Sequence, residues 1–301
     1  MANIDISERE FKQYPKKKKK IKGSSIITFI FLAMIALAVL VPLYVIIVTS
    51  FKTLDQITLG RIFDLPTTWT FEGWNKAWSE VCSGMTCNGV KAGFFTSIKI
   101  LIPSIAISVG LASITGYALA LWKIKWAGSF LFVLFICAFV PFQVIMIPLV
   151  LITAKLGIYG TFWAVAIVHG VLSMPFLTLI FRNFYKDIPP ELINAALMDS
   201  GSFWRIFGEI VLPMSGNIII VVLILVITGV WNDFLIGLTF GGFGAQPMTV
   251  ILANTVITGT GAVRYNVDMA AALLTALPPL IVYFALGKFF VQGISAGAIK
   301  G

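Results

Sequence analysis

Charge is scarce in this sequence. Only 12% of its 301 residues are charged, and it holds a single histidine, whereas soluble domains carry about 25% charged residues. Hydrophobic residues make up 58% of the chain, above the about 45 to 50% that is usual for soluble domains. The shortage of charge excludes an ordinary soluble fold and predicts a protein of the lipid bilayer.

The sequence also lacks the groups that carry enzyme chemistry. It contains no GxxxxGK[ST] phosphate-binding loop. No cluster of His, Cys and carboxylate residues with metal-ligand or nucleophile spacing lies within its apolar stretches. We therefore expect no enzyme and no directly bound cofactor or metal, and any ATP chemistry must belong to another polypeptide.

Six apolar stretches are long enough to cross a bilayer, which takes about 20 helical residues. They cover residues 25–50, 95–121, 127–152, 160–181, 217–238 and 270–292. The fold class predicted from them is all-α, a polytopic membrane helical bundle with six transmembrane helices. Prolines interrupt several of these stretches, which suits helices that kink around a cavity: Pro103, Pro141, Pro148, Pro175, Pro278 and Pro279.

The basic residues predict the orientation. Much of the net charge of +9 comes from Lys16–Lys20 and Lys22, just before the first apolar stretch. Phospholipid headgroups explain this run better than nucleic acid does, and it serves as a topology signal. With the amino terminus inside, fifteen basic residues lie on the cytoplasmic side and seven outside. Both termini are therefore predicted to be cytoplasmic, in a prokaryotic inner membrane.

The chain is expected to divide into four parts. These are a basic tail (1–24), a first helix with an outer segment (25–94), a five-helix membrane domain (95–292) containing a cytoplasmic loop (182–216), and a short tail (293–301). The first apolar stretch exceeds the 7 to 15 residues of a cleavable signal core, so it is interpreted as an uncleaved anchor. Tryptophans in the outer segment suit the headgroup level, or a surface for a partner.

Two of the three cysteines, Cys82 and Cys87, lie in this outer segment, within CSGMTC. An oxidising exterior permits a disulfide between them. Two free thiols are the alternative. A zinc site is not expected, because no further Cys or His accompanies the pair.

The loop between the fourth and fifth stretches predicts two short helices and a turn. Pro190 suits the first position of a helix, where Glu191 then lies at the positive end of the dipole. Gly201 suits a left-handed helix end, and Ser202 is a candidate cap for the next helix. Bulky apolar residues of that second helix either pack on the ends of the spans or dock on a separate protein.

This loop resembles the EAA loop of ABC transporter permeases of the binding-protein-dependent importer class. The family pattern is Glu-Ala-Ala, three residues, Gly, nine residues, Ile, one residue, Leu-Pro. The chain has Asn194, Ala195, Ala196, then Ser200, and then Ile210, Leu212 and Pro213. Two positions depart from the pattern, because Asn194 replaces Glu and Ser200 replaces Gly, although Gly201 follows.

The resemblance implies that this loop docks into a cleft on a cytoplasmic ATPase. The docking residues it implies are Asn194, Ala195, Ala196, Asp199, Ser200 and Gly201. It further implies an ATPase dimer that binds the ATP, a second homologous permease, and an extracytoplasmic solute-binding protein.

Further similarity points to the carbohydrate-uptake branch of this family, and so to a sugar substrate. The residues that carry it are Trp231, Asn232, Asp233, Phe234, Gln246–Met248 and Ser295–Gly301. Residues Cys87–Phe95, CNGVKAGFF, resemble permeases for glucose or related monosaccharides.

Asp233 is the only acidic residue deep in a predicted span, where a charge is costly unless it faces water or a partner. Asn232 and Asp233 are therefore candidates for the translocation pathway or its gate. The alternative for Asp233 is a capped or paired residue near the outer end of its helix. His169 is interpreted as a packing or hydrogen-bonded residue and not a ligand. The rival function is a stand-alone secondary transporter or channel, which would need no ATPase-docking helix pair.

Overall fold

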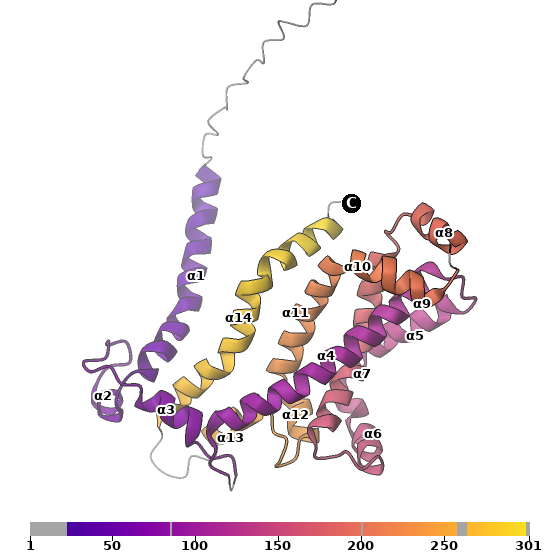
Figure 1. Ribbon diagram of the computed structural model, residues 1–301. Helices are drawn as coiled ribbons and strands as arrows, with labels where there is room; N and C mark the ends of the chain where they lie inside the picture. Colours follow the sequence, from indigo (N-terminus) through magenta and orange to yellow (C-terminus); the bar gives the residue numbers. More distant parts are fainter. Residues whose placement is uncertain (1–22, 85, 200, 258–263, 299–301) are drawn as a thin grey trace, which may run out of the picture. The chain divides into compact units, whose positions relative to one another are not determined.

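The computed structural model describes residues 23–84, 86–199, 201–257 and 264–298, and this part of the chain is built from helices (Figure 1). In chain order they are α1 (Gly23–Ser50), α2 (Leu54–Leu59), α3 (Glu72–Ser79), α4 (Gly89–Leu121), α5 (Ala127–Phe139), α6 (Phe142–Lys155), α7 (Phe162–Tyr185), α8 (Pro190–Asp199), α9 (Phe203–Ile206), a π-helical turn (Phe207–Val211), α10 (Leu212–Met214), α11 (Gly216–Asn232), α12 (Leu235–Phe240), α13 (Met248–Ile257) and α14 (Tyr265–Ala298). The lysine run up to Lys22, Ser200 and residues 299–301 lie outside the described residues.

Four single helices of the described part are long and apolar enough to cross a membrane: α1, α4, α7 and α14. Two bent pairs also qualify if each forms one span. One joins α5 to α6 at 99°, and the other joins α9–α10 to α11 at 79°. The structure thus agrees with a polytopic helical bundle and gives four to six spans, so the expected six is the upper end of this range.

The third predicted span, 127–152, is wrong as a continuous helix. It divides at Val140 and Pro141, which are both extended, with ψ of 122° and 130°. Proline disfavours helical geometry in the residue before it and has no N–H to donate to the preceding turn. The sequence identified Pro141 as a kink, and the structure makes it a full break.

Two helices extend beyond the apolar stretches predicted as spans. Helix α4 begins at Gly89, before residue 95, and α14 continues to Ala298, past residue 292. Helix α13 was not predicted at all. Hydropathy identifies only the apolar part of a helix, and a helix can extend past it into polar surroundings without a signal.

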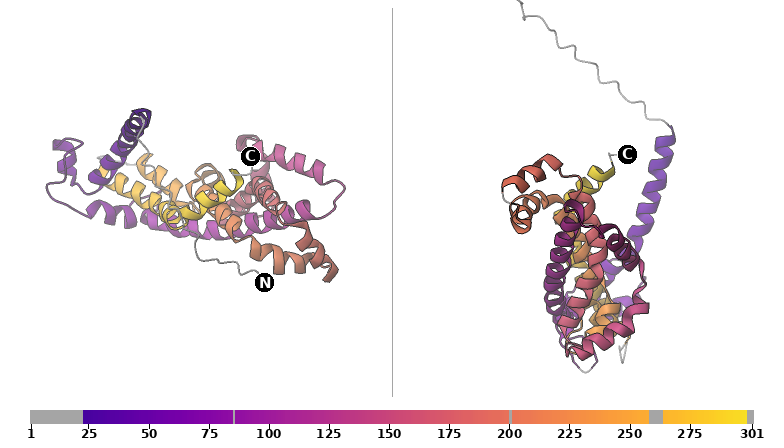
Figure 2. Two further views of the ribbon diagram at one scale, coloured as in Figure 1. Left: turned by 90° about the horizontal axis from the view of Figure 1, so that it is seen from above. Right: turned by 90° about the vertical axis from the view of Figure 1, so that its right-hand side faces the viewer.

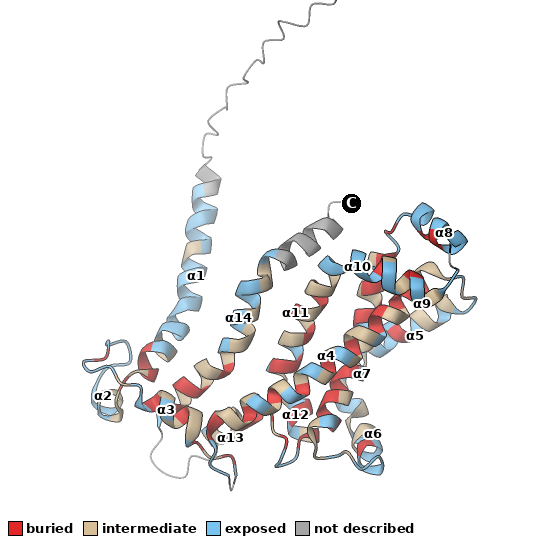
Figure 3. Cartoon of the chain, in the orientation of Figure 1, coloured by how far each residue is buried: buried red, intermediate tan, exposed pale blue. Residues whose placement is uncertain are grey.

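Residues 1–45 and 46–301 form two separate compact units. In the first unit, α1 presents apolar side chains that are exposed in the isolated chain (Figure 3). Such a helix, apolar all round, suits direct contact with lipid. The first predicted span is therefore one long apolar helix, and its role as an uncleaved anchor stays a prediction.

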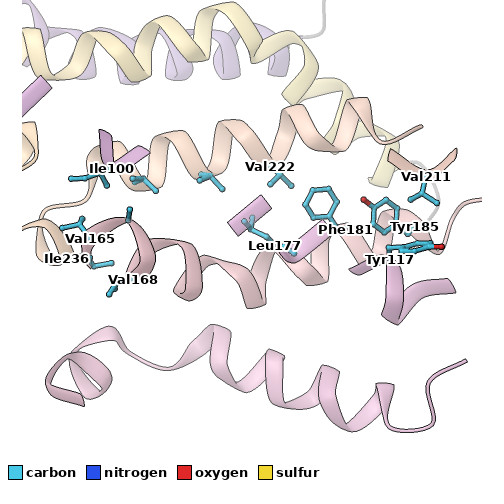
Figure 4. Packing of buried hydrophobic residues seen from close by; sticks show 14 of the residues in the cluster. Ile100, Tyr117, Val165, Val168, Leu177, Phe181, Tyr185, Val211, Val222 and Ile236 are labelled. Carbon is cyan, nitrogen blue, oxygen red and sulfur yellow. The ribbon is translucent and has the colours of Figure 1, made fainter. Parts of the chain in front are cut away.

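The second unit has its core between α4, α7 and α11 (Figure 4). Small residues allow α4 and α7 to approach closely: a Cβ on Gly170 would lie 2.6 Å from Ile107 Cγ2, and one on Gly116 would lie 2.8 Å from Phe181 Cβ. Ser104 Oγ lies 3.2 Å from the carbonyl oxygen of Ala166 and donates to it. Small residues and interhelical hydrogen bonds of this kind are how helices associate in lipid.

The helix ends of this second unit gather into two groups (Figures 1 and 2). The carboxyl ends of α4 and α7, the segment α8–α10 and the start of α11 lie together, and we call this group the coupling end. The start of α4, α3, α12, α13 and the start of α14 form the opposite end. A second, smaller core fills the opposite end around Trp231, whose Nε1 donates to the carbonyl oxygen of Thr275 at 3.0 Å.

Candidate functional site

Helix α8 has two different faces. Ile193 and Ala196 are buried, whereas Asn194, Ala195 and Asp199 are exposed. Pro190 is its first residue and Glu191 lies in its first turn, as the sequence predicted. Of the implied docking residues, the structure therefore places Asn194, Ala195 and Asp199 on one accessible surface and turns Ala196 inward.

The turn after α8 depends on Gly201. Its φ is +59°, the left-handed region that side chains disfavour. This confirms the prediction that glycine ends the helix here. Ser202 precedes α9 in extended geometry, but its side chain makes no cap hydrogen bond. Its backbone carbonyl instead accepts from Ile206 N at 3.0 Å, so the predicted side-chain cap was wrong.

The second helix of the loop is attached to its own chain. From α9 it continues through the π-helical turn into α10, which contains Pro213. Phe203 lies 4.7 Å from Tyr117 and 5.2 Å from Trp122, measured between ring centroids, and Phe207 lies 5.3 Å from Tyr117. The aromatic residues expected to fill a partner's pocket thus largely fill one in this chain.

One aromatic side chain of the loop remains available to a partner. Trp204 is 64% exposed, and Met198 at the end of α8 is 89% exposed. The packing alternative therefore holds for Phe203 and Phe207, and docking on a separate protein stays a prediction for the exposed residues. Phe203 and Phe207 pack on the end of α4, while Trp204, Met198 and the outer side of α8 form an accessible surface, which we call the docking face.

One hydrogen bond connects this loop to α4, and a second connects α4 to α7. The hydroxyl of Tyr117, near the end of α4, donates to the carbonyl oxygen of Phe203 at 3.2 Å. The hydroxyls of Ser113 on α4 and Tyr185 at the end of α7 lie 2.7 Å apart. A cavity of about 600 Å³ separates α8 from the end of α4, with Tyr117, Trp122 and Ile193 in its wall. A displacement of the loop would therefore be passed to α4 and α7.

A second candidate site lies where α11 ends. The predicted span 217–238 is interrupted here, because α11 stops at Asn232 and α12 begins at Leu235. Asp233 Oδ2 accepts from Ile236 N at 2.9 Å and from Gly237 N at 3.0 Å, and so caps α12. Asn232 is exposed and Asp233 is half-buried. The capping alternative for Asp233 is thus present in the structure.

Asp233 also has a partner that the sequence did not identify. His169 Nε2 on α7 lies 3.5 Å from Asp233 Oδ2. His169 is only 6% exposed. Both side chains border a cavity of about 380 Å³ whose wall is otherwise mostly apolar, with Leu225 and Val226 among its residues. The sequence did contain one signal for this contact. A single histidine and a single acidic residue, each in an apolar span, both need a polar partner.

The opposite end brings two sequence motifs together. The structure joins Cys82 and Cys87 by a disulfide. Inside this loop, Ser83 Oγ donates to Gln246 Oε1 at 2.7 Å and accepts from Asn254 Nδ2 at 2.9 Å. Met248 N donates to Ser97 Oγ at 2.9 Å. The loop is therefore fastened to the Gln246–Met248 segment.

Within the part of the chain that the structure describes, no group of three or more His, Cys, Asp or Glu side chains could hold a metal ion. The chemistry available at both candidate sites is hydrogen bonding, charge pairing and helix displacement.

A family model described as "Binding-protein-dependent transport system inner membrane component" matches residues 108–296. The matched range begins within α4 and contains both candidate sites. It includes the whole of the loop from α8 to α10 and the break at Asp233.

The curated relatives of this chain include two permease proteins. The probable ABC transporter permease protein PH1216 of Pyrococcus horikoshii is 40% identical over 164 residues, which cover 54% of this chain and 59% of that protein. The arabinooligosaccharides transport system permease protein AraQ of Halalkalibacterium halodurans is 28% identical over 288 residues, which cover 91% of this chain and 95% of that protein.

A solved structure has the same fold. It is the crystal structure of a bacterial ABC transporter involved in the import of the acidic polysaccharide alginate, and one of its chains matches with a TM-score of 0.78 at 19% identity. The match covers 92% of this chain and 100% of that chain. At this identity the likeness shows the fold alone.

Proposed function

Because the chain belongs to the family of inner membrane components of binding-protein-dependent transport systems, we propose that it is the permease subunit of an importer that carries a sugar. As a member of this family it is a multi-pass membrane permease subunit of an ABC importer, a transport subunit and not an enzyme. The stand-alone secondary transporter or channel is not favoured.

A carbohydrate substrate is supported by two observations. The relative AraQ is named for arabinooligosaccharide transport and aligns along nearly the whole chain. The residues that resemble the carbohydrate-uptake branch, Trp231–Phe234 and Gln246–Met248, pack around one break at the opposite end, where Thr249 Oγ1 donates to the carbonyl oxygen of Asp233. The glucose or monosaccharide subgroup suggested by Cys87–Phe95 stays a prediction.

The partners are a cytoplasmic ATPase dimer that binds ATP, a second homologous permease and an extracytoplasmic solute-binding protein. The observation that carries the ATPase contact is the two-faced helix α8, which is held on the bundle by Ile193 and Ala196 but leaves Ala195 exposed. ATP binding at the dimer favours one of two packed arrangements, and the docking face passes that bias to α4 and α7.

The orientation follows from the same surface. An ATPase that uses cellular ATP requires the coupling end to face the cytoplasm, and basic residues lie at this end, among them Lys123, Lys186 and Arg205. Helix α14 leads away from the opposite end, so its carboxyl end is cytoplasmic in this orientation. Both termini are cytoplasmic in this proposal.

Asn232 and Asp233 contribute to the pathway or its gate. The supporting observation is that the helix is open at this point, with Asn232 exposed and Asp233 at a cavity inside the bundle. Amide and carboxylate groups can exchange hydrogen bonds with sugar hydroxyls.

Uptake assays test the substrate class. Cells with and without this gene are given labelled glucose, a labelled arabino-oligosaccharide and a labelled amino acid, and a strain with the gene restored is the control. We expect loss of carbohydrate uptake alone, recovered on restoration. Loss of amino-acid uptake with carbohydrate uptake intact would contradict the proposed substrate.

A further inference from the structure

One close polar contact joins two helices that are remote in sequence. His169 lies on α7, and Asp233 follows the last residue of α11. Their side chains approach to 3.5 Å, and the exposed fractions of the two side chains are 7% and 19%. The two residues are 64 positions apart in sequence, so only the folded bundle brings them together.

The surroundings of the pair make each partner depend on the other. The cavity beside them is lined mainly by Phe176, Leu177 and Ile236 and similar apolar side chains. A charged group in such surroundings is stabilised by a partner and is costly once the partner is withdrawn. Within the lining of this cavity, Ser173 is the remaining side chain with a polar group.

The carboxylate belongs structurally to α12 and not to α7. Its Oδ2 accepts from two N–H groups of α12, and the backbone carbonyl of Asp233 accepts from Thr249 Oγ1 on α13. Helix α12 is itself close against the segment before α13, because a Cβ on Gly237 would lie 2.3 Å from Pro247 Cγ. The pair therefore joins α7 to the segment where the end of α11, α12 and α13 meet.

This link lies on the route from the coupling end to the break. Tyr185, at the far end of α7, is bonded to Ser113 on α4, and α4 holds the loop through Tyr117. A displacement of α7 that begins at the docking face would withdraw His169 from an acceptor that stays with α12.

We infer that His169 is a positioning residue of the transport pathway. It holds the broken end of α11 against α7 in the arrangement seen here, and its separation from Asp233 is part of the change to the other arrangement. The inference rests on the proposed pathway role of Asn232 and Asp233 and adds to it the residue that controls their position.

The consequence is a shift between two states. Without the imidazole at position 169 the present arrangement loses one close polar contact to a carboxylate, and such a contact shifts a two-state equilibrium by roughly tenfold. The break then opens more often, and Val230, which borders the cavity and is 7% exposed here, becomes more accessible.

The test measures that accessibility in the complete transporter, reconstituted with its ATPase, its second permease and its binding protein. Val230→Cys is introduced together with Cys137→Ser, which removes the exposed free thiol. The rate of labelling by a water-soluble maleimide is then measured without nucleotide. His169→Met removes the donor, His169→Gln keeps one, and Asp233→Asn weakens the acceptor.

The matched control is Thr228→Val. Thr228 lies on α11 near the break, but its hydroxyl donates only to Ile224 and Leu225 of its own helix. We expect His169→Met to raise the labelling rate roughly tenfold and His169→Gln and Thr228→Val to leave it within about twofold. Combined with Asp233→Asn, His169→Met should add little, because the same contact is already lost.

An unchanged rate in His169→Met, or effects of His169→Met and Asp233→Asn that simply add, would overturn the inference. Failure of both His169 variants to assemble would do the same, because glutamine keeps the donor and so separates positioning from folding. If only His169→Met fails to assemble, Asp233→Asn takes its place, and its labelling rate should rise roughly tenfold. Sugar uptake by the parent complex is measured in parallel, so loss of the proposed function is recognised separately.

Discussion

Tyr117 donates a hydrogen bond to the backbone carbonyl of Phe203 across 3.2 Å and so fastens the second helix of the coupling loop to the end of α4. The rings of the same two residues lie 4.7 Å apart. Next to them, Trp204 is 64% exposed. Two neighbouring aromatic residues thus have different roles: Phe203 holds the loop to its own chain, and Trp204 belongs to the docking face.

Replacing Phe203 and Trp204 separately distinguishes these roles. Phe203→Ala removes about 2 kcal/mol of apolar packing and should leave the ATPase bound while its hydrolysis no longer drives uptake. Trp204→Ala should instead weaken binding of the ATPase. Copurification and the ratio of sugar taken up to ATP hydrolysed measure the two effects, and an identical defect in both variants would contradict the distinction.

A bulky residue at Ala195 should block docking. Ala195 is exposed on α8 next to Asn194, and small residues permit the close backbone approach that a docked helix needs. We expect Ala195→Trp to assemble in the membrane but to lose ATP-driven uptake. Ala154→Trp is the control, because Ala154 is an exposed alanine on α6, away from the docking face. Normal uptake by Ala195→Trp would remove Ala195 from the contact.

The turn at Gly201 should tolerate asparagine better than valine. At a φ of +59° a side chain costs roughly 1 to 2 kcal/mol, least for asparagine and most for β-branched residues. Gly201→Val should therefore reorient α8 and uncouple ATP hydrolysis from uptake, while Gly201→Asn stays close to the parent. Equal activity of the two variants would show that this backbone geometry does not matter for coupling.

The cap that Asp233 provides can be separated from its charge. Asp233→Ser keeps a good capping side chain without a carboxylate, whereas Asp233→Ala keeps neither, and loss of a cap costs about 1 kcal/mol. We expect the melting temperature of the purified protein to fall in Asp233→Ala and to stay close to the parent value in Asp233→Ser. Uptake should be reduced in both variants. Full uptake in Asp233→Ala would remove this residue from the pathway or gate.

The disulfide between Cys82 and Cys87 makes a simple prediction about thiols. Without reductant, a maleimide should modify Cys137 and neither loop cysteine. Reduction should expose both loop thiols and loosen the contact of Ser83 with Gln246. Mass mapping of the labelled peptides measures this, with Cys82→Ser plus Cys87→Ser as the unbridged reference. Modification of both loop cysteines without reductant would show that the bridge is absent.

Local signals in the sequence predicted the coupling loop well. Pro190 starts α8 because proline fixes its own φ near the helical value, and Gly201 ends it because glycine can adopt a positive φ. Both effects act on a single residue and do not depend on the rest of the chain. The continuation of α9 through a π-helical turn was not predicted, and neither was the packing of Phe203 on Tyr117. Both depend on α4, which is remote in sequence.

The break at Asp233 shows the same limit. Hydropathy continued the helix to 238, because Leu235 and Ile236 are apolar, whereas the carboxylate ends α11 by capping the next helix. The partner of that carboxylate, His169, lies on another helix, and no local pattern connects them. The sequence predicts that each residue needs a polar partner, but only the fold identifies that partner.

We propose that the docking face binds the ATPase, and crosslinking from position 195 tests this contact most directly. Ala195→Cys in a Cys137→Ser background is charged with a maleimide that carries a photoreactive group, and the complex is irradiated in native membranes. We predict a covalent product with the ATPase subunit from position 195 and none from Ala154→Cys. Labelling of position 195 only from outside the cell, or a product with no ATPase in it, would contradict the account.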